Sequence, residues 1–168
     1  MPSASLIVAR AFWGVCIFRL GPQDLPRSGL LLALAALANL VLGVIINQRQ
    51  LPLGAAILVA LLEFGVLTGL TALLTLAFRY PRRLVQTLTA LFGSGAVIGS
   101  LALLMLLVLR DIPQILRVGI FLWNLLVMAH ILRHALQVHM AAGFVIAIGY
   151  AMVLIQLIGL FGRSLGSA

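Results

Sequence analysis

Five long apolar stretches, separated by short polar or proline-containing turns, dominate the chain. Each is close to or longer than the roughly 18–20 apolar residues that a helix needs to cross the hydrocarbon core of a bilayer. We therefore predict an all-α fold, a polytopic transmembrane helix bundle with five spans. The predicted spans are Gly29–Ile46, Leu53–Phe78, Leu84–Leu109, Gln114–Leu132 and Met140–Phe161.

The turns between these spans are short and carry residues that end or begin helices. The turn Asn47–Gln50 makes the first two spans antiparallel neighbours, and Pro52 suits the first turn of the second span. Pro81 ends that span, because the residue before a proline disfavours helical geometry. Asp111 is a predicted N-cap for the fourth span. No connection is long enough for a folded domain, so function must lie within the bilayer, at its surface or against another protein.

The first 28 residues form a separate N-terminal segment. Leu6–Leu20 is apolar, but its longest uninterrupted part, Ala11–Phe18, is too short to span a membrane. We predict a short interfacial helix with buried aromatic side chains and snorkelling arginines, or alternatively a peripheral helix packed on the bundle. The aromatic side chains are Phe12, Trp13 and Phe18. The chain thus divides into an N-terminal part, 1–28, a spanning domain, 29–162, and a short tail, 163–168.

Composition supports the membrane interpretation. The chain has 168 residues, of which 64% are hydrophobic and 8% charged, whereas soluble domains have about 25% charged residues. The net charge is +8, and the positive side chains behind it are all arginines, because the sequence contains no lysine. At span ends, arginines meet lipid phosphates. No stretch is polar enough to build the basic face of a nucleic-acid-binding fold, so we expect no nucleic-acid partner.

Arginine placement also predicts orientation. Five spans put the termini on opposite sides of the membrane, with seven arginines on the N-terminal side and four on the other. The positive-inside rule then favours a cytoplasmic N-terminus. The N-terminus lacks the features of a cleavable signal peptide, so we expect the first span to act as the membrane signal.

Glu63 is the most unusual residue of the sequence, because it is the only acidic residue that must lie at membrane depth. A charged group there costs about 2.5–3.5 kcal/mol on insertion scales. We expect Glu63 to face the bundle interior, either as a proton- or ion-linked site or a contact to a partner, or as a protonated residue that fixes packing. Its candidate partners on other helices are Asn39, Asn124, His130 and Gln156.

Two Gly-x-x-x-Gly motifs occur in the second and third spans, at Gly65 and Gly69 and at Gly95 and Gly99. Small residues at this spacing let helix backbones approach closely. The two helices are joined by a short turn, so we predict that the two motifs pack against each other. The alternative is that one motif forms a homodimer or docks a partner.

Metal and cofactor chemistry is not expected. Cys16 is the only cysteine, and His130 and His134 share a helix face but lack a third ligand nearby. A serine protease within the membrane is also disfavoured. The Gly-x-Ser-Gly motif of rhomboid-type proteases lacks its first glycine around Ser94, and a base such as His130 must be positioned beside the nucleophile. We therefore predict a protein that is not an enzyme.

A cationic turn follows the second span and contains Arg79, Arg82 and Arg83. The simplest interpretation is an anchor that follows the positive-inside rule. The alternative is a surface for anionic lipid or for a cytoplasmic partner.

The layout resembles the Yip family of small membrane proteins, in its bacterial form. The segment Arg82–Ser94 is similar to the stretch leading into that family's third span, and Leu122–Leu126 to the start of a later helix. The Asp-Leu-Tyr-Gly-Pro motif of eukaryotic members is absent except for Gly21-Pro22, which argues against a Rab-GTPase role. The resemblance implies a membrane-organising or partner-binding protein of a bacterial inner membrane.

Two functions follow as hypotheses. The first is a non-enzymatic integral membrane protein that acts through contacts with lipids, with other membrane proteins or with itself, as a small subunit or scaffold. The alternative is a small transporter or channel subunit that uses Glu63. The alternative requires Glu63 to share a cavity with Thr71, Asn124 or His130.

Overall fold

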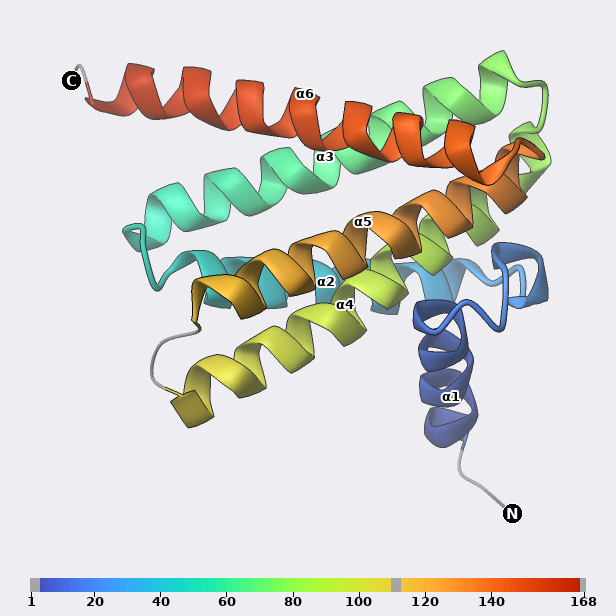
Figure 1. Ribbon diagram of the computed structural model, residues 1–168, viewed down its shortest axis with the longest axis horizontal. Coiled ribbons are helices and arrows are strands. Elements are labelled where there is room, and N and C mark those ends of the chain that lie inside the picture. The colour runs from blue at the N-terminus through green and yellow to red at the C-terminus, as the bar shows by residue number, and fades with distance from the viewer. Residues whose placement is uncertain (1–3, 110–112, 167–168) are drawn as a thin grey trace.

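The computed structural model describes residues 4–109 and 113–166, and the side chains of 7–109 and 113–160. These residues form six α-helices and two 3-10 helices and contain no strand (Figure 1). The elements are α1 Ala4–Cys16, η1 Pro22–Asp24, α2 Gly29–Asn47, α3 Leu53–Ala77, η2 Pro81–Arg83, α4 Leu84–Leu109, α5 Gln114–Leu136 and α6 Met140–Gly166.

The predicted all-α bundle with five spans is confirmed. Helices α2 to α6 are each long and apolar enough to cross a membrane. Some boundaries differ from the prediction: α2 includes Asn47, α5 continues through Arg133 to Leu136, and α6 reaches Gly166, so part of the predicted tail is helical. The predicted N-cap Asp111 lies outside the described residues.

Local capping explains where several helices begin and end. Ser28 is the N-cap of α2, and its hydroxyl oxygen accepts a hydrogen bond from the Leu31 amide at 3.2 Å. Pro52 is the N-cap of α3 rather than a residue of its first turn. After α3, Arg79 takes a left-handed conformation with φ 64°, and the Tyr80 amide donates to the Thr75 carbonyl at 2.7 Å. This left-handed turn ends α3 and reverses the direction of the chain within a few residues, before α4 begins.

The helix pairing differs from the prediction. Helix α4 packs most extensively against α2 and only slightly against α3. A Cβ added at Gly95 would collide with Asn39 of α2, and one at Gly99 would touch α2 side chains. A Cβ added at Gly65 or Gly69 would meet none of the described residues within 4 Å. The predicted pairing of the two glycine motifs is therefore wrong. A short turn makes two helices antiparallel, but it does not determine which faces they present to each other.

Helix α1 crosses the direction of the five long helices and packs on α4 and α5 (Figure 1). Phe12, Val15 and Cys16 are buried there, whereas Trp13 and Phe18 remain on the surface. Phe12 lies where a side chain on Gly93 would have to be, so glycine at that position admits the aromatic ring. This arrangement matches the alternative of a peripheral helix packed on the bundle.

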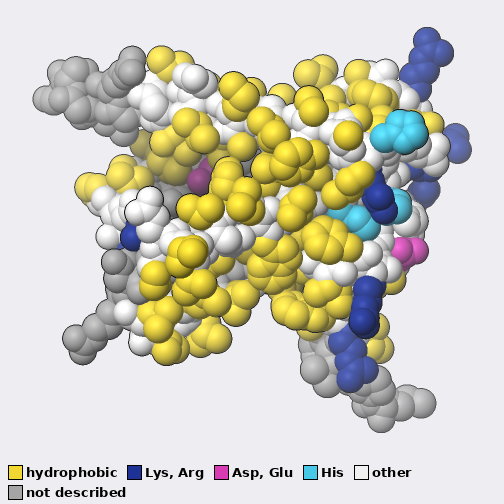
Figure 2. Space-filling view, viewed as in Figure 1, with side chains coloured by type: hydrophobic (Ala, Val, Ile, Leu, Met, Phe, Trp, Pro, Cys, Tyr) yellow, Lys and Arg dark blue, Asp and Glu magenta, His cyan; other side chains and the backbone are white. Residues whose placement is uncertain are grey.

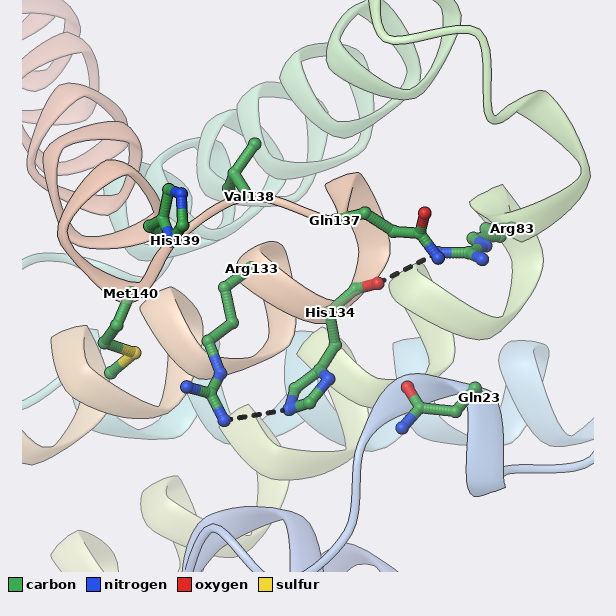
Figure 3. A pocket seen from close by; sticks show the side chains of 8 residues that line it. All are labelled: Gln23, Arg83, Arg133, His134, Gln137, Val138, His139 and Met140. Carbon is green, nitrogen blue, oxygen red and sulfur yellow. Dashed lines mark hydrogen bonds between the residues drawn. The ribbon is translucent and has the colours of Figure 1, made fainter.

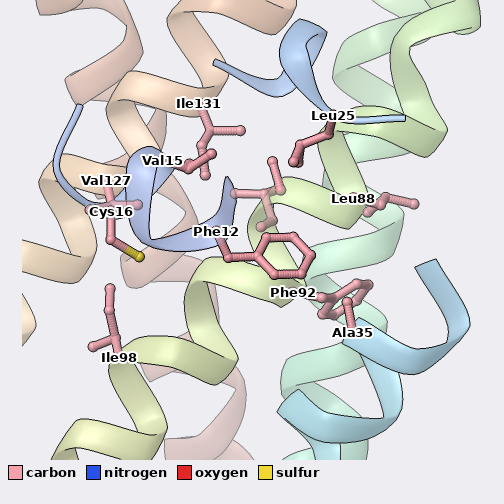
Figure 4. Packing of buried hydrophobic residues seen from close by; sticks show 12 residues of the cluster. Phe12, Val15, Cys16, Leu25, Ala35, Leu88, Phe92, Ile98, Val127 and Ile131 are labelled. Atoms are coloured by element: carbon pink, nitrogen blue, oxygen red, sulfur yellow. The ribbon is translucent and has the colours of Figure 1, made fainter. Parts of the chain in front are cut away.

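The main core lies beneath α1 and η1, where α1, α4 and α5 meet (Figure 4). Every residue of α4 from Gln86 to Ser94 is buried, and α5 is largely buried from Leu125 to Leu136. We call this region the packed half. Its arginine-rich end carries the α3–α4 turn (Figure 2). The remaining part of the bundle, with the C-terminal halves of α2, α4 and α6, is called the open half.

Candidate intramembrane binding site

A cavity of about 410 Å³ extends from the edge of the packed half into the open half and is lined by all five long helices. Its wall is mostly apolar, which is typical of small-molecule sites. Figure 2 shows the hollow on the flank of the molecule, among apolar side chains. The polar side chains that line it are Asn39, Asn47, Glu63, Ser94, Asn124 and Tyr150.

Glu63 contributes the only ionisable carboxyl among the described lining residues, and no arginine lines the cavity with it. The carboxyl lies against Gly43 of α2, where an added Cβ would be 3.8 Å from Oε2. The Asn47 side-chain amide lies beside the same carboxyl and interacts with it. Two residues of α2 thus shape the immediate surroundings of Glu63: the glycine provides space, and the amide provides a hydrogen-bond donor.

The opposite wall holds further hydrogen-bonding groups. The Tyr150 hydroxyl of α6 lies 3.0 Å from the Thr71 hydroxyl of α3. Because Thr71 donates its own proton to the Leu67 carbonyl at 2.6 Å, Tyr150 must be the donor to Thr71. The Tyr150 oxygen keeps its acceptor capacity. This bond ties α3 to α6 at the edge of the cavity.

Helices α5 and α6 diverge away from their shared loop (Figure 1). Exposed lining residues on both helices indicate that the cavity opens between them. Phe121 of α5 is 51% exposed and Ile155 of α6 is 63% exposed, although both line the cavity. Asn124, on the same side of α5, is also exposed. Because all three lie within spans, the opening faces the level of the lipid acyl chains.

His130 does not reach this cavity. It is buried in the packed half, where its Nε2 atom lies 3.1 Å from the Leu20 carbonyl and must donate to it. Its ring lies edge-on to those of Phe18 and His134, with centroids 5.3 and 4.7 Å away. Of the predicted polar candidates, the structure brings together Glu63, Asn39 and Asn124 and separates His130 from them.

Ser94 and His130 do not form a nucleophile–base pair in this arrangement. The Ser94 hydroxyl donates to the Leu91 carbonyl at 3.2 Å, whereas His130 bonds to Leu20. The i, i+4 histidines also lack further ligands, since the described residues contain no group of three or more His, Cys, Asp or Glu side chains able to hold a metal ion.

The three arginines of the basic turn play different structural roles. Arg79 and Arg82 are exposed. Arg83, predicted to face lipid or a partner together with them, instead turns toward α5 and donates to the carbonyls of His134 and Ala135 at 3.0 and 3.2 Å. Its guanidinium also lies 4.7 Å above the Tyr80 ring. Arg83 therefore caps the negative end of the α5 dipole.

Two polar residues of the cavity are not among the residues predicted from the sequence. The sequence places Asn47 in a turn, whereas α2 continues through Asn47 and sets it beside Glu63. Tyr150 is the only tyrosine within a predicted span. A polar aromatic residue inside an apolar helix was the signal that could have identified it, because its hydroxyl needs a partner there.

Neither a family model, nor a curated protein, nor a solved structure matches the chain. The fold itself defines the class: the protein is a multi-pass integral membrane protein with five helices able to span the bilayer. The resemblance to the Yip family stays a prediction.

Proposed function

We propose that this membrane protein binds a lipophilic cation in the cavity around Glu63 and carries it across the bilayer, as a small transporter or a transporter subunit. It does so without enzymatic chemistry. The observation that supports the proposal is the convergence of Glu63, Asn39 and Asn124, from three different spans, on one cavity. An ionisable group within a span is costly, and such groups commonly mark substrate or ion pathways.

The wall chemistry indicates the ligand class. The apolar lining suits a hydrocarbon body, and the single carboxyl has no cationic side chain beside it in the described lining. A cation on the ligand supplies the missing counter-charge. The amides of Asn39 and Asn124 and the oxygen of Tyr150 can then orient polar parts of the ligand. The opening between α5 and α6 admits a ligand that is already dissolved in the bilayer.

Equilibrium binding tests the site. The probe is benzyltrimethylammonium, titrated calorimetrically into the purified protein in a neutral detergent. Glu63→Gln keeps the shape of the side chain but removes its charge, so we expect about a tenfold or greater loss of affinity. Asp24→Asn makes the same chemical change outside the cavity and is expected to leave binding unchanged. Neopentylbenzene, the uncharged isostere of the probe, should bind weakly to both the native protein and Glu63→Gln.

Equal affinity of the native protein and Glu63→Gln for the cation would contradict the proposal. Equal binding of the cation and its uncharged isostere to the native protein would also contradict it, because the carboxyl would then play no part in recognition.

A second function, that of a small subunit or scaffold, is favoured by the outer face of α3. Gly65 and Gly69 are exposed, and a Cβ added at either would have no neighbour within 4 Å among the described residues. A helix of another membrane protein, or of a second copy, can approach such a face closely. Gly65→Leu should then abolish co-purification of the partner after gentle extraction and crosslinking. Recovery of the native protein only as a monomer would argue against this function.

We also propose that the protein lies in a bacterial inner membrane with its arginine-rich end in the cytoplasm. The gathering of arginines at the end that carries α1 and the α3–α4 turn supports this orientation (Figure 2). Single cysteines introduced at Arg82 and Arg49, in a Cys16→Ala background, provide the test. A membrane-impermeant maleimide added to intact cells should label position 49 and leave position 82 unlabelled, and the reverse pattern would contradict the orientation.

A further inference from the structure

A second cavity, of about 600 Å³, lies at the arginine-rich end of the molecule and shares no lining residue with the cavity around Glu63 (Figure 3). It is bounded by the end of α5, the loop to α6, the start of α6, η2 and η1. Its polar lining residues are Gln23, Arg83, Arg133, His134, Gln137 and His139. Two arginines and two histidines thus face one pocket, and no carboxylate is among the described lining residues.

The two arginines are not equivalent. Arg83 is already engaged by the carbonyls at the end of α5. The Gln137 side-chain amide also contacts Arg83. In the orientation that pairs both of its ends, its oxygen accepts from Arg83 Nη2 at 2.8 Å and its nitrogen donates to the Tyr80 hydroxyl at 3.0 Å. These contacts hold Arg83 in place at the side of the pocket.

Arg133 retains most of its hydrogen-bonding capacity. Its Nη2 atom lies 3.2 Å from His134 Nε2, while its Nε atom is buried and has no partner in the described part of the chain. A guanidinium can only donate, so His134 Nε2 accepts and the other ring nitrogen of His134 carries the proton. Arg133 and His134 therefore both present donors, and Figure 3 shows them side by side at the pocket.

Two further features favour an anion. Helix α6 begins at Met140 on the edge of the pocket, and the amides of a first helical turn lack partners within the helix. His139, at the rim, is exposed and adds another nitrogen. Asp24 influences His134 electrostatically but is not among the lining residues, and one of its oxygens accepts from the Gly21 amide at 2.7 Å.

We propose that this pocket binds a phosphate-bearing anion, with Arg133 as its principal ligand and His134, His139 and the start of α6 as supporting donors. Arginine is well suited to phosphate oxygens, because its planar guanidinium donates two parallel hydrogen bonds. The pocket lies where spans end, at the level of lipid headgroups. The phosphate can therefore come from an anionic phospholipid or from a free phosphate, and the site is independent of the proposed transport.

The experiment uses two probes on the full-length protein. In the first, the protein is held in nanodiscs of mixed phosphatidylglycerol and phosphatidylcholine, and native mass spectrometry counts the retained lipids of each kind. In the second, inorganic phosphate is titrated into the protein in neutral detergent. We expect Arg133→Gln to reduce the retention or affinity of one of these probes about tenfold, and Arg133→Lys to preserve much of it.

The matched control is Arg82→Gln, which removes an exposed arginine at the same end but outside the pocket. We expect less than a twofold change. Loss of phosphatidylglycerol alone in Arg133→Gln identifies a lipid headgroup, and loss of phosphate binding identifies a free phosphate. His139→Gln, at the exposed rim, provides a second test that does not disturb packing, with an expected loss of several-fold. Equal losses in the Arg82 and Arg133 variants, or no loss in either, would overturn the proposal.

Discussion

The packed and open halves of the bundle are built from the same helices but differ in how those helices are covered. In α4, the residues from Gln86 to Ser94 are all buried, whereas beyond Ser94 only Ile98 is. Helix α1 and η1 cover the first of these regions. None of the described elements covers the second in this way, and the helices there border the cavity.

This difference in covering predicts that the packed half mainly determines stability, whereas the open half mainly determines ligand binding. Apolar helices alone gain little by packing together in lipid, because acyl chains are as apolar as leucine side chains. The packed half therefore depends on close fit and on hydrogen bonds between its elements. The open half leaves space for a ligand and keeps Glu63 beside it. Mutations in the packed half should change unfolding, whereas mutations in the open half should change binding.

The largest effect is expected at Gly93. An added side chain there collides with Phe12 of α1, so Gly93→Leu should displace α1 and lower the free energy of unfolding by about 3 kcal/mol. Gly65→Leu places the same side chain in open space on α3 and should change it by less than about 1 kcal/mol. Denaturant unfolding in detergent measures both variants. Similar losses in the two variants would contradict the distinction between halves.

The next effect concerns the reactivity of Cys16, which lies in α1 outside the spans. Burial raises the pKa of the Cys16 thiol from 9.0 to about 11, so at pH 8 it has about a hundredfold less thiolate than an exposed cysteine. Alkylation by iodoacetamide should be correspondingly slow, and Phe12→Ala should accelerate it by loosening α1. Rapid alkylation of the native protein would show that α1 does not cover this site.

The same pKa predicts how stability depends on pH. The thiol is harder to ionise in the folded than in the unfolded protein, so its stabilising contribution is complete below about pH 9 and is lost as the pH rises through 11. The free energy of unfolding of the native protein should decline in this window more steeply than that of Cys16→Ala. Identical slopes would contradict a buried thiol.

A smaller loss is expected at Gln86, which ties the segment around η1 to α4. Its amide donates to the Leu25 carbonyl at 2.8 Å and accepts from Arg27 Nε at 3.1 Å. Gln86→Leu leaves both groups unpaired and should cost about 2 kcal/mol. Gln156→Leu, on an exposed face of α6, is the matched control and should cost less than about 0.5 kcal/mol.

The smallest effect is expected at Tyr150, in the wall of the cavity. Tyr150→Phe removes the bond to Thr71, but Thr71 still donates to the Leu67 carbonyl. The free energy of unfolding should fall by only about 1 kcal/mol. A loss as large as that of Gly93→Leu would show that the walls of the cavity are as important for stability as the packed half.

The sequence predicted the five spans because apolar length is a direct consequence of bilayer thickness. It could not predict that α4 pairs with α2, since turn length fixes the order of helices but not their facing sides. The close approach of Gly95 to Asn39 is therefore visible only in the structure. The same is true of the cavity: Glu63 and Asn124 were candidates from their residue types, whereas Asn47 and Tyr150 became candidates only once the helices were placed.

Flux through reconstituted vesicles tests the central claim most directly. Proteoliposomes containing the native protein, Glu63→Gln or Asp24→Asn would be loaded with buffer and exposed to radiolabelled benzyltrimethylammonium. We expect uptake above that of protein-free vesicles for the native protein and Asp24→Asn, and uptake at the protein-free rate for Glu63→Gln. Uptake by Glu63→Gln equal to that of the native protein would contradict a transport site centred on Glu63.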